Sequence, residues 1–183
     1  MADLSTARRS PQLPESALVR LLPAATRYVV RGDDHALEAA ARALDVAPAV
    51  AVCRTSTRGE HALLWLGPDE RLVLAPAEAT LMTGTRLTEA LAALHHSLVD
   101  VSHRQVALEI SGPLAVDALA AGCPLDLDAG AFPVGMCTRT MLAKAEIVLW
   151  RTELERFHIE VWRSFAAYVC DFLAEVACEL AAR

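Results

Sequence analysis

The same order of predicted elements occurs twice along the chain, and this repetition limits the available folds more than any other feature. Each unit contains a strand, a helix, a strand hairpin, a further strand and a closing helix, over about residues 25–96 and about 97–183. Helices separated by clusters of antiparallel strands are typical of the α+β class. We therefore predict one α+β domain over residues 25–183, with mixed or antiparallel sheets and helices on their outer faces.

The first unit is recognisable from its apolar runs. Tyr28–Val30 is expected to form a strand, and Asp33 or Asp34 can cap the helix that follows it. A later helix is predicted to open at Thr85. After that residue leucines recur at helical spacing, at Leu87, Leu91 and Leu94.

The second unit shows the clearest alternation. Residues 105–110 alternate between polar and apolar side chains, which predicts a strand with one buried face. Pro113 is well placed in the first turn of a helix over Leu114–Ala121. Residues 157–162 alternate in the same way. The final helix, from Ser164 to about Ala181, carries one apolar stripe, formed by Phe165, Val169, Phe172, Val176 and Leu180.

Residues 1–24 differ from the rest of the chain, because they contain proline, serine and arginine without a sustained period. We predict that they form a flexible N-terminal arm. Arg8 and Arg9 are followed by Pro11 and Pro14, and not by the apolar stretch that a signal peptide requires. No apolar run in the sequence approaches the ~20 residues that span a bilayer. These features predict a cytoplasmic protein without a membrane segment.

The charge balance limits the partners of this chain. Its net charge of −6 disfavours a general nucleic-acid-binding protein, which would normally be basic. A local basic patch near the start of the chain is formed by Arg8, Arg9, Arg20, Arg27 and Arg31. It leaves two interpretations open, a solvated arm or one that docks on an acidic partner. The five cysteines include no Cys-x-x-Cys pair, so we expect reduced thiols, most of which pack as small apolar groups.

No group of residues has the pattern of a catalytic centre. Ser102 and His103 are neighbours on a predicted strand and face opposite sides, so they cannot pair as a nucleophile and its base. His95 and His96 are adjacent at the expected helix end and lack further ligands at a zinc spacing. The glycines do not form a phosphate-binding motif. We therefore predict no catalytic, cofactor-binding or metal-binding residue on this chain.

Trp162 is the residue that best suits contact with another protein. It stands on the polar face of the closing strand with His158 and Glu160, and it precedes Arg163. Tryptophan and arginine concentrate binding energy at interfaces. If this face is exposed, Trp162, Arg163 and His158 form an interface. If a helix covers it, Trp162 is a packing residue, and both alternatives stay open.

Four segments together resemble the gamma subunit family of heterotetrameric sarcosine oxidase, over roughly residues 25–180. They read WLGPDERLVLAP, LVDVSHRQVALEISGP, CPLDLDAGAFPVGMCTRTMLAKAEIVLWR and FHIEVWRSFAAYVCDFL. Cys170 departs from the family pattern, which leads us to expect an aromatic residue there. The layout is also similar to the folate-binding aminomethyltransferase fold. The Lys-Gly-Cys motif of one folate-dependent branch is absent, because Val134–Cys137 reads VGMC.

The resemblance implies a non-catalytic structural subunit. The complex of that family demethylates sarcosine oxidatively and yields glycine, hydrogen peroxide, and formaldehyde or 5,10-methylenetetrahydrofolate. The resemblance implies alpha, beta and delta subunits as partners. It places FAD, FMN, NAD, zinc and tetrahydrofolate on those subunits, with no cofactor on this chain. A free-standing folate-binding or aminomethyltransferase-like protein is the alternative.

Overall fold

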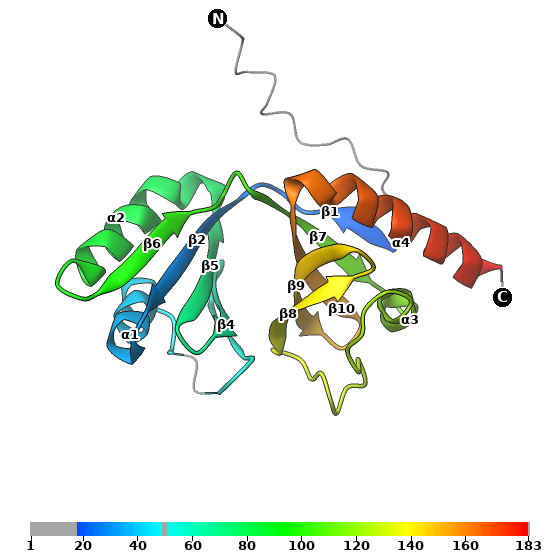
Figure 1. Ribbon diagram of the computed structural model, residues 1–183, viewed down its shortest axis with the longest axis horizontal. Helices are drawn as coiled ribbons and strands as arrows, with labels where there is room; N and C mark the ends of the chain where they lie inside the picture. The colour runs from blue at the N-terminus through cyan, green and yellow to red at the C-terminus, as the bar shows by residue number, and fades with distance from the viewer. Residues whose placement is uncertain (1–17, 49–50, 183) are drawn as a thin grey trace, which may run out of the picture.

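The computed structural model describes residues 18–48 and 51–182 and contains two five-stranded sheets (Figure 1). The strand order of the first sheet is β3 (Thr55–Arg58), β4 (His61–Gly67), β5 (Glu70–Pro76), β2 (Ala25–Gly32) and β6 (His96–Asp100). The strand order of the second sheet is β1 (Val19–Leu21), β7 (Gln105–Ser111), β10 (Arg156–Trp162), β9 (Ala145–Glu153) and β8 (Cys137–Leu142). All of these strand pairs are antiparallel. The predicted α+β class is confirmed.

Helices cover the outer side of each sheet (Figure 1). They are α1 (Asp34–Ala43), α2 (Thr80–Leu91), α3 (Ala115–Ala120) and α4 (Ala166–Ala181), with short 3₁₀ turns η2 (Ala77–Ala79) and η3 (Arg163–Phe165). Beneath α1 and α2, Leu63 and Val73 of the first sheet are almost fully buried. Beneath α3 and α4, Leu108 and Phe157 of the second sheet are fully buried. A third core joins the inner faces of the sheets, through Leu64, Leu72, Leu74, Cys137 and Val148.

The two sheets have equivalent strand orders. When β2 is matched with β7 and β5 with β10, the others match in the same order: β4 with β9, β3 with β8, and β6 with β1. In each unit the strand before the closing helix leads into a 3₁₀ turn, η2 or η3. Because β6 pairs with β2, the first sheet extends to Asp100 and does not end near residue 96.

Strand β10 has one apolar face and one polar face, as its alternation predicts. Phe157, Ile159 and Val161 are each 0% exposed and belong to the outer core beneath the helices. Glu160, on the opposite face, is also 0% exposed and points to the first sheet. A buried carboxylate requires partners that satisfy its charge, so the polar face is tied to the other sheet.

The predicted arm is wrong over its last residues. Val19–Leu21 forms strand β1, with Val19 opposite Ile110 and Leu21 opposite Leu108 of β7. Val19 is 3% exposed and joins the core of the second sheet. A strand of three residues is too short to show alternation in the sequence. Residues 1–17 of the predicted arm lie outside the described residues.

The closing helix of the first unit also differs from its prediction. Helix α2 begins at Thr80, before the predicted Thr85, and η2 leads into it. His96 does not end a helix but starts the edge strand β6, in which no residue is buried. An edge strand without a buried face has no apolar alternation, so the sequence pattern did not reveal it.

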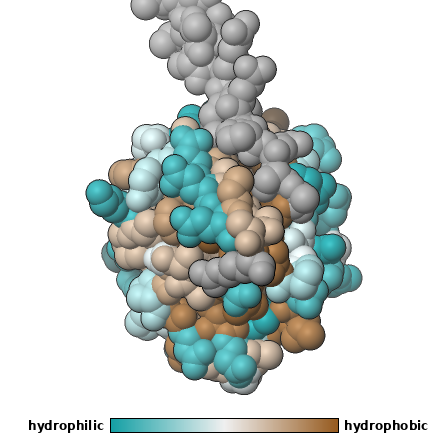
Figure 2. Space-filling view, turned by 90° about the vertical axis from the view of Figure 1, so that its right-hand side faces the viewer, coloured by the Kyte–Doolittle hydropathy of each residue, from teal (hydrophilic) through white to brown (hydrophobic). Residues whose placement is uncertain are grey.

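Cys170, which replaces the expected aromatic residue, is buried in the core between α4 and the second sheet. Burial, helped by the charge of Asp171, raises the pKa of its thiol to about 11. Cys170 therefore packs as a neutral apolar group. Apolar and hydrophilic side chains are mixed on the face of the molecule that Figure 2 shows. No helix within the described residues is long and apolar enough to cross a membrane.

Gly84 of α2 lies against the ring of Tyr28 from β2. A Cβ atom at this position would overlap the Tyr28 hydroxyl and lie 3.1 Å from Cζ of the same ring. The hydroxyl donates a hydrogen bond of 3.3 Å to the Thr80 carbonyl oxygen, which limits the movement of the ring. The close approach of the helix to the sheet thus explains a glycine within a helix.

We expect Gly84→Ala to lower the free energy of unfolding by about 1–3 kcal/mol, because overpacking outweighs a gain of about 1 kcal/mol in helix propensity. Tyr28→Phe combined with Gly84→Ala recovers part of this loss, because the overlapping hydroxyl is removed. Thr88→Ala, at an exposed position of α2, is the matched control and is expected to change stability little. Urea denaturation measures all three, and a more stable Gly84→Ala protein would contradict the packing argument.

Candidate functional site

A buried ion pair joins the inner faces of the two sheets. Arg27 of β2 donates from Nε to Glu160 Oε2 at 2.6 Å and from Nη2 to Glu160 Oε1 at 3.1 Å. Arg27 is 1% exposed and Glu160 is 0% exposed. Arg27 Nη1 also donates to the Ala25 carbonyl oxygen at 2.9 Å. This bidentate arrangement has the geometry that makes an arginine–carboxylate pair strong.

His158 extends the pair within the second sheet. Its Nε2 lies 2.8 Å from Glu160 Oε1, and its ring centroid lies 5.6 Å from that of Trp150. Burial by itself would raise the pKa of Glu160, but the hydrogen bond with His158 and the charge of Arg27 outweigh burial and lower it. Glu160 therefore remains a carboxylate, held by its two partners.

A second charged group joins the sheets at Glu70. Arg31 of β2 donates to Glu70 Oε2 at 2.8 Å, and Arg139 of β8 donates to the same oxygen at 3.0 Å. Burial alone would raise the pKa of Glu70, but the hydrogen bonds and charges of Arg139 and Arg31 outweigh it, so the pKa is lowered. One carboxylate of the first sheet is thereby bonded to an arginine from each sheet.

Main-chain hydrogen bonds close one side of the junction. Cys137 donates from its amide to the Cys53 carbonyl oxygen, and Thr55 donates to that of Gly135, both at 2.9 Å. Cys137 is 0% exposed, and burial raises the pKa of its thiol. The thiol lies 3.5 Å from the Trp65 carbonyl oxygen, to which it can donate. Cys137 is thus the buried strand thiol that the sequence predicts.

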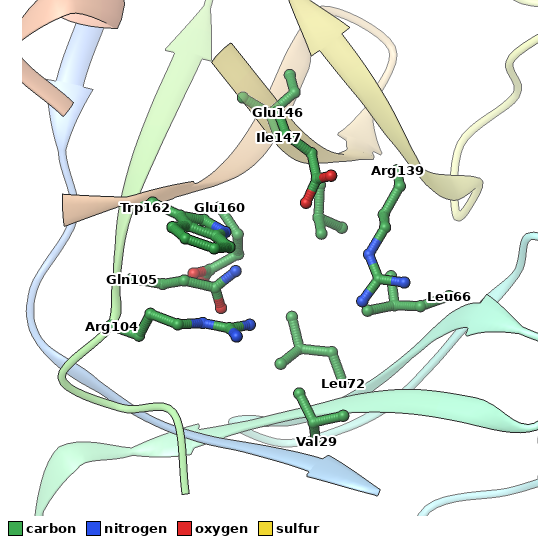
Figure 3. Close-up of a pocket in the computed structure, with 11 residues that line it drawn as sticks. Val29, Leu66, Leu72, Arg104, Gln105, Arg139, Glu146, Ile147, Glu160 and Trp162 are labelled. Atoms are coloured by element: carbon green, nitrogen blue, oxygen red, sulfur yellow. The ribbon is translucent and has the colours of Figure 1, made fainter. Parts of the chain in front are cut away.

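A small cavity lies at the polar end of the space between the sheets, and Figure 3 shows the side chains that line it. Arg104, Gln105, Glu160 and Trp162 line one side of a cavity of about 10 Å³, and Arg139 lines the other. A cavity of this size holds about one water molecule. It does not have room for a substrate or an organic cofactor.

A wider hollow of about 360 Å³ lies elsewhere between the sheets. Trp150 and His158 line it from the second sheet, and Glu60 and His61 line it from the β3–β4 hairpin. The remaining lining is mainly alanine, leucine and proline: Leu22, Pro23, Ala24, Ala25, Ala62, Leu74, Ala75, Pro76 and Ala107. No serine or cysteine of the described residues lines this hollow beside His61 or His158, so it does not present a Ser–His or Cys–His pair.

The structure separates the three residues predicted for an interface. Trp162 is 42% exposed, and the guanidinium carbon of Arg104 lies 5.0 Å from the centroid of its ring. Arg163 lies beside it and donates from Nε to the His103 carbonyl oxygen at 3.1 Å. The side chain of His158 is only 15% exposed and belongs to the buried ion pair. Trp162 is thus exposed, Arg163 is the half-buried residue that follows it, and His158 belongs to the network between the sheets.

Sequence reasoning placed Arg27 in a basic patch near the start of the chain, which is wrong because Arg27 is 1% exposed, and it did not identify Arg104 as a partner of Trp162. Arg27 meets Glu160 across 133 positions of the chain, and only the packing of the two sheets brings them together. Arg104 reaches Trp162 because β7 pairs with β10 from Gln105 opposite Trp162. The alternation of β10 placed Glu160 and Trp162 on one face, but no local pattern identified their partners. Within the described ranges, no three His, Cys, Asp or Glu side chains gather as a metal site.

Comparison with known families agrees with this architecture. The family described as "Sarcosine oxidase, gamma subunit family" matches residues 31–179, from the end of β2 into α4. The chain belongs to this family. A curated family relative, the sarcosine oxidase subunit gamma of Corynebacterium sp. (strain P-1), is 38% identical over 120 residues. That alignment covers 66% of this chain and 58% of the relative's length.

Solved structures extend the family match. A chain of the heterotetrameric sarcosine oxidase from Corynebacterium sp. U-96, in complex with pyrrole 2-carboxylate, has a TM-score of 0.80 and 29% identity. The match covers 96% of this gamma-family chain and 92% of that chain. Glycine cleavage system aminomethyltransferase T from Bartonella henselae has a TM-score of 0.64 and 18% identity, over 85% of this chain and 44% of that chain. This second similarity shows the fold alone, and the predicted resemblance to both is confirmed.

We expect Arg27→Met to lower the free energy of unfolding by about 3–5 kcal/mol, because it leaves Glu160 buried without its arginine. Arg27→Met combined with Glu160→Leu is expected to recover much of this loss, because no buried charge then remains unpaired. Arg20→Met is the matched control, because Arg20 is 61% exposed in its pair with Glu109 and should cost about 1 kcal/mol or less. Chemical denaturation distinguishes these outcomes. Equal losses at Arg27 and Arg20 would contradict the role of the buried pair.

Acid is expected to destabilise the protein through Glu70. Its pKa in the folded protein lies below the ordinary value of 4.5, so the unfolded chain binds protons first as the pH falls. The stabilisation is therefore present above the unfolded pKa and is lost as the pH falls through the lower folded pKa. We expect Glu70→Gln to be less stable at neutral pH and to show a shallower pH dependence below about 4.5. The measurement is urea denaturation at several pH values, with Glu60→Gln at an exposed position as the control. If the free energy of unfolding of Glu70→Gln depends on pH as steeply as that of the unaltered protein, this account is contradicted.

Proposed function

We propose that this chain is the gamma subunit of a heterotetrameric sarcosine oxidase, with alpha, beta and delta subunits as its partners. The observation that carries the proposal is the match to a chain of such an enzyme, which covers 96% of this chain and 92% of the other. Membership of the gamma subunit family supports it. The curated relative from strain P-1 is covered over 58% of its length, so the activity of the whole complex belongs to the proposal.

The proposed complex demethylates sarcosine oxidatively to glycine in the cytoplasm. Its other products are hydrogen peroxide and formaldehyde, or 5,10-methylenetetrahydrofolate when tetrahydrofolate is present. FAD, FMN, NAD, zinc and tetrahydrofolate belong to the other subunits in this proposal. The role of the gamma subunit is to hold its partners in position, without a catalytic residue.

Two features support a structural role. The buried carboxylates between the sheets, Glu70 and Glu160, are bonded to arginines and do not face a space that a substrate can enter. Trp162 and Arg163 lie at the surface, and we keep them as interface residues. His158 is assigned to the network between the sheets, because its side chain is 15% exposed and bonded to Glu160.

The test is to recover the tagged full-length chain from its native cytosol and to record the absorbance spectrum and subunit composition of the eluate. We expect three partner chains that differ in size from the tagged chain, together with a flavin spectrum. We also expect hydrogen peroxide to form when sarcosine is added. A tag on an unrelated cytosolic protein is the control for carry-over. A colourless chain of 19.7 kDa without partners would contradict the proposal, and folate titration would then test the free-standing alternative.

A further inference from the structure

An aromatic surface lies where β10 ends and α4 begins. Trp162 is 42% exposed, Phe165 is 41% exposed and Tyr168 is 38% exposed. Phe165 ends η3 and Tyr168 lies in the first turn of α4, and this spacing of three places both side chains on one side of the helical segment. Trp162 has an extended backbone, ends β10 and directly precedes η3. Such side chains are normally enriched at interfaces, since each buries a large area when covered. We name these three residues and Arg104 the aromatic surface.

The arginines at this surface lack acidic partners. The Arg104 guanidinium lies over the Trp162 ring at 5.0 Å, and no carboxylate of the described residues is bonded to it. Arg163 uses Nε for the His103 carbonyl oxygen at 3.1 Å, and its Nη atoms have no carboxylate among the same residues. By contrast, the arginines between the sheets are paired with Glu70 or Glu160. Arg104, which is exposed and lies over the Trp162 ring, and the half-buried Arg163 therefore retain donors that are not bonded to a carboxylate of the described residues.

The fold does not require this exposure, as the first unit shows. In that unit η2 and α2 take the places of η3 and α4. The two helices bury residues at equivalent positions. Thr83 and Leu87 are buried in α2, and Val169 and Leu173 are buried in α4. Yet the last residue of η2 is a small buried alanine, whereas η3 ends in the exposed Phe165. The aromatic residues are thus particular to the second unit.

The first turn of α2 adds apolar surface beside the same connection. Leu81 is 83% exposed and Met82 is 61% exposed. Both helices start next to the chain that passes from β6 to β7 (Figure 1). Thr80 bonds to Thr26 of β2, and the next residue along β2 donates to the Ser102 side chain in that connection. Apolar surface is therefore present on both sides of the β6–β7 connection.

We infer that the aromatic surface docks a segment of a partner subunit in which an acidic side chain is next to an apolar one. The apolar group would pack on Trp162, Phe165 and Tyr168, and the carboxylate would accept hydrogen bonds from Arg104 or Arg163. An arginine already stacked on a ring loses little freedom when it binds a carboxylate, and the pair strengthens as water leaves. This inference rests on the proposed function, because the partner is another subunit of the complex.

Competitive incorporation tests the inference with the whole complex. The unaltered chain and a differently tagged variant are expressed together with the other subunits, and the ratio of the two is measured in the purified complex. We expect Trp162→Ala and Arg104→Glu each to be incorporated at least about tenfold less than the unaltered chain, as at interface hot spots. Arg104→Gln, which removes the charge with little change in size, should show a smaller loss in the same direction.

Matched variants control for surface changes in general. Met141→Ala removes an apolar side chain that is 41% exposed on edge strand β8, and Lys144→Glu reverses a charge in the exposed β8–β9 turn. Both are expected to be incorporated like the unaltered chain. The unfolding midpoint of each variant is measured as well. If Trp162→Ala unfolds early, Arg104→Gln decides the outcome, because the substitution keeps the main-chain hydrogen bonds of residue 104 and changes a side chain whose contact is with the Trp162 ring.

The possible outcomes separate the two proposals. Equal incorporation of the Trp162 and Arg104 variants overturns the docking surface and leaves the proposed function intact. Absence of the unaltered chain from any complex overturns both. If the chain alone is a dimer that Trp162→Ala converts to a monomer, a second copy is the occupant and the inference is wrong. It is also wrong if deletion of residues 1–17 abolishes the effect of Trp162→Ala, because that segment is then the occupant.

Discussion

The buried pair of Arg27 and Glu160 is the interaction on which the arrangement of the two sheets depends. Each residue is almost without exposure, and each comes from a different sheet. Removal of either partner would leave the other charge buried and uncompensated, which costs more than the loss of an ordinary surface pair. The pair therefore does more than add stability. It allows few relative positions of the sheets, because both oxygens of Glu160 are engaged.

This constraint also explains the division of the molecule into an inner and an outer part. Charged groups of the two inner faces form ion pairs with one another, at Glu160 and at Glu70. They leave a cavity of only about 10 Å³ at the polar end. The helices close the outer faces over apolar cores. Phe165 and Tyr168 remain exposed at the start of α4, and Arg104 and Arg163 nearby are not bonded to a carboxylate of the described residues. Under the proposed function, such a chain positions its partners, and the chemistry belongs to them.

The predictions succeeded where the sequence alternates and failed where it does not. The alternation in β7 and β10 predicted their apolar buried faces, and the apolar periodicity predicted the helix α4. The predicted stripe was wrong in detail, because the buried residues of α4 are Ala166, Val169, Cys170 and Leu173, whereas Phe165 is 41% exposed. Strand β1 was assigned to an arm because three residues are too few to show an alternation of apolar and polar side chains. Strand β6 was missed because an edge strand without a buried residue has no apolar face. Of the predicted interface, Trp162 and Arg163 lie together at the surface, whereas His158 proved to be a partner of Glu160.

The sequence by itself determined the α+β class, the repeated order of elements and the resemblance to the gamma subunit family. These depend on local periodicity and on segments of adjacent residues, which can be recognised without knowledge of the fold. Only the tertiary structure decided that Arg27 faces Glu160 and that Arg104 lies on Trp162. The physical reason is that alternation specifies which side of a strand is polar. The partner that a polar side chain meets depends on how two sheets, or two paired strands, are positioned against each other.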